Sequence, residues 1–315
     1  MLAATIRDGR VLVEEHPDPE PGSGECLVRV IAAGINGADL LQRKGLYPAP
    51  PGSPELIPGL ELAGEVEACG EDAGRFCAGD RVMAIAGGGG QAELAVVHER
   101  QLMPVPDSLG WPQAGGCPEV FCTAYDALFS QSELKAGERL LVHGGAGGVG
   151  TAAIQIGANA GARVTATVRN EALRGGVAAL GAEAIAAEGF ADAGPFEVIL
   201  ELIGAPNLPD DLKALGTGGR IVVIGVGAGA KAEVNLLALM GKRGSIHAST
   251  LRARPLEEKA ALARLVEAHV LPAIASGSIE VPVAADFPLA EAEAAYDQFA
   301  AGGKLGKIIL TMPAA

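Results

Sequence analysis

The spacing of apolar and polar residues changes near residue 118. Before that point, short segments alternate apolar and polar residues and are separated by proline-containing turns, which is typical of half-buried β-strands. The clearest of these segments are residues 25–35, 59–70, 80–86 and 91–98. Many short strands with frequent turns predict a β-barrel rather than a layered sheet.

After residue 118 the spacing alternates between that of helices and that of buried strands. A helix is predicted to begin at Pro118 and to cover 118–131, and another covers 149–161. Continuous apolar segments, typical of buried strands, are residues 139–143, 162–168, 196–204, 220–226 and 245–250. This alternation predicts a parallel sheet with helices on both faces. The tail from Pro255 adds helices and a last strand that could close either part.

Composition narrows the class of protein. The 315 residues are 49% hydrophobic, but no apolar stretch is long enough to span a bilayer, and the first residues lack the apolar segment of a secretory signal. Five cysteines, an odd number, suit free thiols in a reducing cytosol. A net charge of −14 disfavours binding to nucleic acid. We therefore expect a cytoplasmic protein with no membrane or nucleic-acid partner.

The sequence HGGAGGVG at residues 143–150 is the strongest local motif. Glycines at 144, 147 and 150 lie between a predicted buried strand and a predicted helix, which is the setting of a dinucleotide site. Glycine lets the backbone approach a pyrophosphate, and amides such as those of Gly148 and Val149 would donate to it from the helix N-terminus. The alternative is a tight connection without a ligand.

The end of the next strand bears on which cofactor binds. NAD sites usually place Asp or Glu about 20 residues beyond the glycines. Here Thr167, Arg169 and Asn170 occupy that region, and Arg174 follows one helical turn later. A guanidinium without a carboxylate suits a 2′-phosphate, so we predict NADPH. The alternative is that both arginines are exposed charges at the start of a helix.

Together these segments resemble the zinc-free quinone oxidoreductase branch of the medium-chain dehydrogenase/reductase superfamily. The resemblance runs the length of the chain and is most specific in AGINGADLLQRKGLYPAPPG, LVHGGAGGVGTAAIQIGANAGARV and GKLGKIIL. It implies an α/β fold with two domains and an active site in the cleft between them. The domains would be a GroES-like β-barrel domain at 1–118 and 256–315, and a Rossmann domain, a doubly wound parallel sheet, at 119–255. It also implies a homodimer joined through the edge strand 245–250.

Two segments depart from the family pattern. The connection near 187–196 is shorter than in the family, so that a crossover helix is reduced to a few residues. Glycines 87–90 replace bulkier residues, which we expect to widen the substrate pocket.

The resemblance also bears on metal binding. Zinc-dependent relatives place Cys where this chain has Asn36 and His where it has Leu60, and neither residue can replace those ligands. We therefore predict no metal. Without a Lewis acid, alcohol oxidation is disfavoured, whereas a quinone or enone accepts hydride unaided.

The resemblance further implies the site residues. Asn36 and Tyr47 are the candidate catalytic residues, and both would also contact the cofactor; the alternatives are an Asn that stabilises its own loop and a packed aromatic. None of the five histidines belongs to a catalytic motif. Further candidates for cofactor binding are Thr123, Gly225, Leu251, Arg252, Lys304 and Lys307. For the charged residues, a solvated surface position is the alternative.

The function predicted from the sequence is NADPH-dependent, metal-free reduction of quinones. One alternative is an NADPH-dependent reductase of enones or enoyl thioesters. The other is a non-catalytic NADPH-binding protein of the crystallin kind, because a fold alone does not fix a function.

Overall fold

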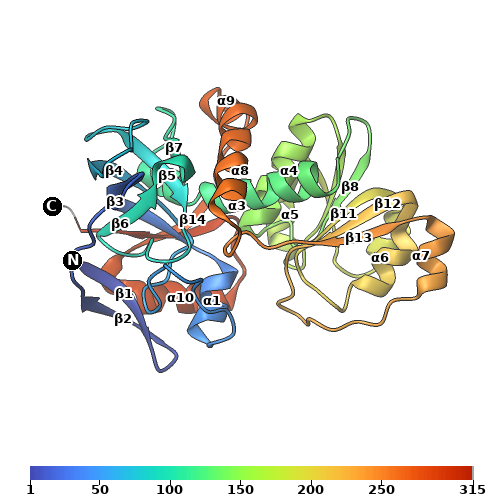
Figure 1. Cartoon of the computed structure of the whole chain (residues 1–315). Helices are drawn as coiled ribbons and strands as arrows, with labels where there is room; N and C mark the ends of the chain where they lie inside the picture. The colour runs from blue at the N-terminus through green and yellow to red at the C-terminus, as the bar shows by residue number, and fades with distance from the viewer. Residues whose placement is uncertain (314–315) are drawn as a thin grey trace. The chain divides into compact units, whose positions relative to one another are not determined.

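A computed structural model describes residues 1–313. The chain forms two compact units, coloured by residue number in Figure 1. The first unit comprises residues 1–122, 251–302 and the C-terminal segment from Lys307. The second unit comprises residues 123–250 and the short segment 303–306. The chain returns to the first unit after Thr250, whereas the sequence placed this boundary at 255. The sequence did not predict that residues 303–306 belong to the second unit.

Antiparallel pairing dominates the first unit. Its main sheet has the order β14-β15-β3-β4-β5-β7, with β6 paired to β3, and β1 and β2 form a separate hairpin. The central strand β3 pairs with β6 along its first half, with β15 along its last residues, and with β4 on its other edge. This bending of the sheet around a core confirms the predicted GroES-like barrel. The strands are β1 (Leu2–Arg7), β2 (Arg10–Glu15), β3 (Glu25–Ile35), β4 (Glu61–Cys69), β5 (Arg81–Ile85), β6 (Leu94–His98), β7 (Leu102–Pro104), β14 (Val283–Pro288) and β15 (Lys307–Thr311).

Helices complete the first unit. Helix α10 (Ala292–Ala301) packs on β2 and β15 and brings Tyr296 into the core beside strand residues such as Leu62. The others are α1 (Gly37–Arg43), α2 (Trp111–Gly115), α8 (Leu256–His269), α9 (Leu271–Ala275) and the 3₁₀ turns η1 (Glu99–Gln101) and η5 (Leu289–Glu291). Helix α3 (Pro118–Tyr125) crosses the boundary between the units and continues as a π-helix, η2 (Asp126–Gln131). The predicted helix over 118–131 is therefore α-helical only in its first part.

The second unit contains a fully parallel sheet of order β10-β9-β8-β11-β12-β13. The chain starts in the middle at β8, moves outward to β10, and returns to β11, so that the direction reverses between β8 and β11. Ligands of doubly wound sheets bind at such a switch point. The strands are β8 (Arg139–Val142), β9 (Arg163–Thr167), β10 (Ala182–Ile185), β11 (Phe196–Glu201), β12 (Leu215–Val223) and β13 (Ser245–Ala248).

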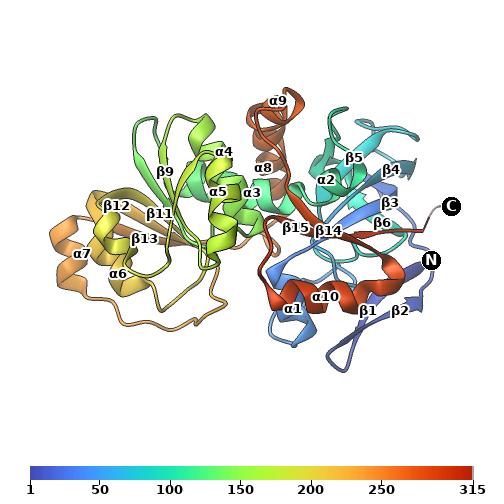
Figure 2. The same ribbon diagram turned by 180° about the vertical axis from the view of Figure 1, so that it is seen from behind.

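Helices and short turns connect the strands of the second unit, which Figure 2 shows from behind in green to orange. Its helices are α4 (Gly148–Asn159), α5 (Arg174–Ala179), α6 (Leu208–Ala214) and α7 (Leu236–Lys242). The connection from β10 to β11 contains only a 3₁₀ turn, η4 (Phe190–Ala193), which confirms the predicted loss of a crossover helix. Among the described residues, no helix combines the length and apolarity needed to cross a bilayer.

Candidate active site

The glycine loop joins β8 to α4 as a tight turn. Gly147 donates its N–H to Gly144 O at 3.0 Å and is the N-cap residue of α4, but it has no side chain with which to cap the helix. A Cβ atom on Gly150 would lie 2.4 Å from Gly144 O, so only glycine allows this approach. The first N–H groups of α4, including those of Gly148 and Val149, therefore lack a side-chain cap and can donate to an anion.

A second segment lies beside this loop. Gly306 donates its N–H to Ala146 O at 2.9 Å, and Gly306 forms a parallel bridge with Gly147. The Lys304 side chain donates to Gly306 O at 3.1 Å. The candidate Lys304 is thus on a segment that borders the glycine loop, although no spacing rule links the two in the sequence.

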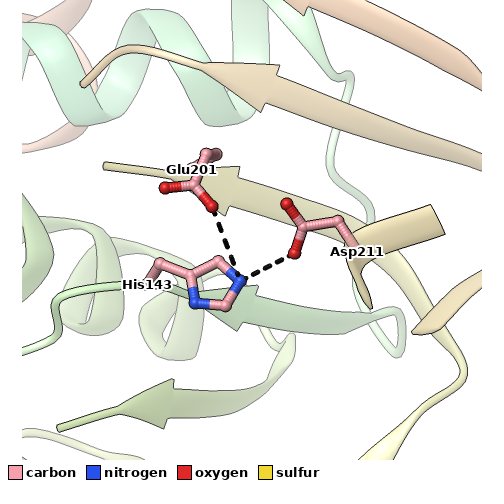
Figure 3. Close-up of side chains that lie close together, drawn as sticks. All are labelled: His143, Glu201 and Asp211. Carbon is pink, nitrogen blue, oxygen red and sulfur yellow. Dashed lines mark hydrogen bonds and ion pairs between the residues drawn. The ribbon is translucent and has the colours of Figure 1, made fainter. Parts of the chain in front are cut away.

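Beneath the loop, three buried side chains converge (Figure 3). His143 Nε2 lies 2.9 Å from Asp211 Oδ1 and 3.8 Å from Glu201 Oε2, and His143 Nδ1 lies 3.1 Å from Thr167 Oγ1. Gly144 N in turn donates to Thr167 Oγ1 at 3.3 Å. This network ties the ends of β8, β9 and β11 and helix α6 to the first glycine of the loop.

The same three residues form the one group within residues 1–313 whose His and carboxylate atoms converge as metal ligands could. Most of these atoms already take part in hydrogen bonds. The 2.9 Å distance between His143 Nε2 and Asp211 Oδ1 is that of a hydrogen bond. Glu201 accepts from Asn207 Nδ2 at 3.0 Å and from Gly204 N at 2.7 Å. Burial raises the pKa of Glu201. We interpret the group as a support for the loop.

The residues expected to select the cofactor follow β9. Thr167 is buried at the strand end, and Arg169 and Asn170 are exposed directly after it. Asn170 Oδ1 accepts from Ala172 N at 3.1 Å and so caps the 3₁₀ turn η3 (Glu171–Leu173). Arg174 Nε donates to Val168 O at 3.4 Å. Arg169 therefore presents a cation at the carboxyl end of the strand next to β8.

Asn36 lies in the first unit, where its amide joins a buried network. Its Nδ2 donates to Glu61 Oε1 at 2.9 Å, and its Oδ1 accepts from Lys307 Nζ at 2.6 Å. Its backbone N–H donates to Asp39 Oδ2 at 2.8 Å, which fixes the start of α1. Direct contact between the Asn36 amide and a ligand stays a prediction, and such a contact would compete with these bonds.

Tyr47 and Arg252 lie together in the same unit. Tyr47 is half-buried, and burial raises the pKa of its phenol. Arg252 is 2% exposed, and its charged group lies 5.2 Å from the centre of the Tyr47 ring. Its Nε, Nη1 and Nη2 donate to Gly87 O, Tyr47 O and Gln42 Oε1 at 2.7, 3.0 and 2.6 Å. For Arg252 the sequence predicted either a contact with the cofactor or a solvated surface charge. Its burial shows that the surface alternative is wrong.

The remaining candidates are Thr123, Leu251 and Gly225. Thr123 is 5% exposed on α3, and Leu251 is half-buried next to Arg252. Gly225 follows β12 and donates its N–H to Glu201 O at 3.1 Å. A role for these residues in cofactor binding stays a prediction.

The effect of glycines 87–90 on the width of the substrate pocket stays a prediction. A Cβ atom on Gly87 would lie 2.1 Å from Ser53 Oγ, and one on Gly90 would lie 2.7 Å from Glu61 O. At these two positions the segment is packed against neighbouring residues of its own unit, so glycine is needed for close packing.

Two family models match the chain. The GroES-like domain of alcohol dehydrogenases matches residues 22–107, and the zinc-binding dehydrogenase model matches residues 180–310. The mouse quinone oxidoreductase is 33% identical over 309 residues, which cover 93% of this chain and 91% of that protein. The human quinone oxidoreductase is 31% identical with the same coverage.

Solved structures agree with these matches. A quinone oxidoreductase from Pseudomonas syringae has a TM-score of 0.87 at 28% identity, covering 99% of this chain and 100% of that one. A mycobacterial protein complexed with NADPH has a TM-score of 0.88 at 27% identity, with the same coverage. Both therefore share the fold over essentially the whole chain.

Proposed function

Because this chain belongs to the quinone oxidoreductase branch of the medium-chain dehydrogenase/reductase superfamily, we propose that it catalyses the NADPH-dependent, metal-free reduction of quinones. The observation that carries the choice of cofactor is Arg169, exposed at the end of β9 with no carboxylate at the position that an NAD site needs. That an NADPH-bound relative shares the fold supports the same choice.

The residues present fit this cofactor. The uncapped N–H groups of Gly148 and Val149 would hold the pyrophosphate, and the Arg169 guanidinium would pair with the 2′-phosphate. Gly150 leaves room for the backbone to approach, since a Cβ atom there would already clash with Gly144 O at 2.4 Å. When bound, NADPH supplies the hydride that a quinone takes up, with one proton, to become a hydroquinone.

The surroundings of Asn36 support chemistry without a metal. Lys307 Nζ lies 2.6 Å from Asn36 Oδ1 and 2.7 Å from Glu61 Oε1, so a fixed positive charge already pairs with the nearest carboxylate. A second cation at this place would be repelled. The acceptor must then stabilise its own developing negative charge, as the conjugated oxygens of a quinone do.

Tyr47 would orient the acceptor. Its raised phenol pKa keeps the hydroxyl protonated and able to donate a hydrogen bond to a quinone oxygen. Arg252 holds the backbone of this residue through Tyr47 O, so the ring position is defined independently of any ligand.

The test is NADPH oxidation with an ortho-quinone in the presence of a chelator. Rapid consumption of NADPH is expected. Binding of NADPH without consumption would instead favour an enone or enoyl-thioester reductase, and absence of turnover with those acceptors as well would favour a non-catalytic NADPH-binding protein.

Arg169→Glu tests the choice of cofactor. It should reverse the NADPH/NADH affinity ratio, because a charge-assisted bond to the 2′-phosphate becomes a repulsion. Arg163→Glu, at the opposite end of β9, is the matched control and should leave the ratio unchanged. An unchanged ratio in Arg169→Glu would remove the argument for NADPH.

We also propose a cytoplasmic homodimer. β13 is an edge of the parallel sheet with unpaired backbone groups, and the nearby helix α7 exposes Leu236, Leu237 and Met240, each at least 68% accessible. Sedimentation should show a dimer that Leu237→Glu weakens. A monomer at all concentrations would refute the proposed assembly.

A further inference from the structure

Lys307 is a buried ammonium group with a complete set of partners. It is the first residue of β15 and is 2% exposed. Its Nζ donates to Ile35 O at 3.0 Å, to Asn36 Oδ1 at 2.6 Å and to Glu61 Oε1 at 2.7 Å. An ammonium has three N–H donors, so each one has an acceptor.

Glu61 completes the arrangement from the opposite side. It is fully buried at the start of β4, and its Oε1 also accepts from Asn36 Nδ2 at 2.9 Å, while its Oε2 accepts from Glu119 N at 2.9 Å. The bonds form a closed ring of Lys307, Asn36 and Glu61. A Cβ atom on Gly34 would lie 2.2 Å from Glu61 Oε1, so the backbone of β3 is shaped around this carboxylate.

Stability alone does not explain such a pair. A buried ion pair is often no more stable than apolar residues of the same volume, because both charges lose their hydration. The pair does fix the orientation of the Asn36 side chain. Lys307 can only donate and Glu61 can only accept, so the Asn36 amide has one possible orientation. Asn36 begins α1, and the chain after α1 leads to Tyr47.

We propose that Lys307 and Glu61 are positioning residues for the reaction, a buried ion pair that fixes the Asn36 amide and the start of α1 and thereby places Tyr47. This inference rests on the proposed quinone reduction. Arg252, which binds Gln42 Oε1 and Tyr47 O, fixes the other end of the same segment. The segment that contains α1 and Tyr47 is thus fixed by hydrogen bonds at both ends of α1.

The test compares Lys307→Met, Glu61→Gln and the double variant. Each single change leaves one buried charge unpaired, so the unfolding equilibrium constant should rise by about two to three orders of magnitude. In the double variant both charges are gone, and the amide oxygen of the substituted side chain can still accept from Glu119 N, so most of this loss should be recovered.

Turnover should separate positioning from stability. In the double variant kcat should stay about tenfold or more below wild type, with KM for NADPH unchanged, because the neutral amide that replaces the Glu61 carboxylate can both donate and accept and no longer fixes one orientation of the Asn36 amide. Thr5→Val, which removes the bond of the buried Thr5 hydroxyl to His16 Nε2 in the first unit, is the control and should keep kcat. Full recovery of both stability and kcat in the double variant would overturn the inference.

A spectroscopic measurement makes the result independent of quinone turnover. The NMR signals of the Asn36 side-chain amide, assigned by their loss in Asn36→Asp, should shift and broaden in Lys307→Met and in the double variant. Unchanged signals would refute the positioning role even if the wild type reduces quinones. Changed signals in a protein without turnover would retain the positioning of Asn36 and refute only the proposed reaction.

Discussion

Arg252→Met tests whether Arg252 stabilises the first unit or binds the cofactor. Methionine retains most of the apolar stem and removes the guanidinium. Three acceptors, Gly87 O, Tyr47 O and Gln42 Oε1, then lose their donors at a site where the arginine is 2% exposed. The contact with the Tyr47 ring is lost as well.

The expected loss follows from these contacts. Each acceptor left without a hydrogen-bond donor lowers the free energy of unfolding by about 1 kcal/mol. Loss of the contact with the Tyr47 ring lowers it by roughly a further 0.5–1 kcal/mol. Relief from desolvation offsets part of this, since burial lowers the pKa of Arg252. The free energy of unfolding should fall by about 3 kcal/mol.

Urea unfolding followed by the fluorescence of Trp111, the single tryptophan, reports on this unit. Arg10→Met is the matched control: its side chain is 64% exposed and its ion pair to Glu293 lies at the surface, so the loss should stay below about 1 kcal/mol. NADPH affinity of the folded Arg252→Met protein should equal that of wild type. Weakened NADPH binding at unchanged stability would refute the structural role and support the cofactor contact predicted from the sequence.

Three further changes test the buried polar groups and the candidate tyrosine. Burial raises the pKa of Asp39 to about 6, so the stability that its proton confers is present below about pH 4 and lost as pH rises through 6. The free energy of unfolding should therefore fall by roughly 3 kcal/mol over this range in wild type relative to Asp39→Asn, and parallel pH profiles would contradict it. His143→Phe should cost about 1–3 kcal/mol in urea unfolding because Asp211 loses its donor. Adding Asp211→Leu should restore stability, and a double variant no more stable than the single one would contradict the pairing. Tyr47→Phe should lower kcat/KM for quinone about fivefold, the value of one hydrogen bond, in steady-state assays; undiminished turnover would exclude Tyr47 from orienting the acceptor.

The elements that the sequence predicted well are those set by local periodicity. The alternation over 25–35 coincides with β3 (Glu25–Ile35), and the five apolar segments after residue 118 became five of the six strands of the parallel sheet. The sixth strand, β10, was not predicted. Burial on one face repeats every second residue in a strand, so a window of a few residues contains the signal. The glycine loop was predictable for the same reason, since its strand, turn and helix are contiguous.

The networks were not predictable because their members are far apart in the sequence. Lys307 and Glu61 meet only through the pairing of β15 and β4 with β3. A signal did exist: Glu61 begins an apolar strand and Lys307 precedes the apolar run IIL, and charges in such positions are rarely buried without a partner. The sequence marks each charge as unusual, but only the fold identifies its partner.

The location of these networks bears on their purpose. Buried polar groups weaken a core unless every donor and acceptor is matched, so apolar packing would serve stability better. Yet this chain places such groups at strand ends, directly beneath the glycine loop and beside both ends of α1. Strand ends are where parallel and barrel sheets present their functional loops. These positions therefore require hydrogen bonds of fixed direction, which apolar packing does not supply. Variants that restore stability with apolar residues should fold without regaining full turnover.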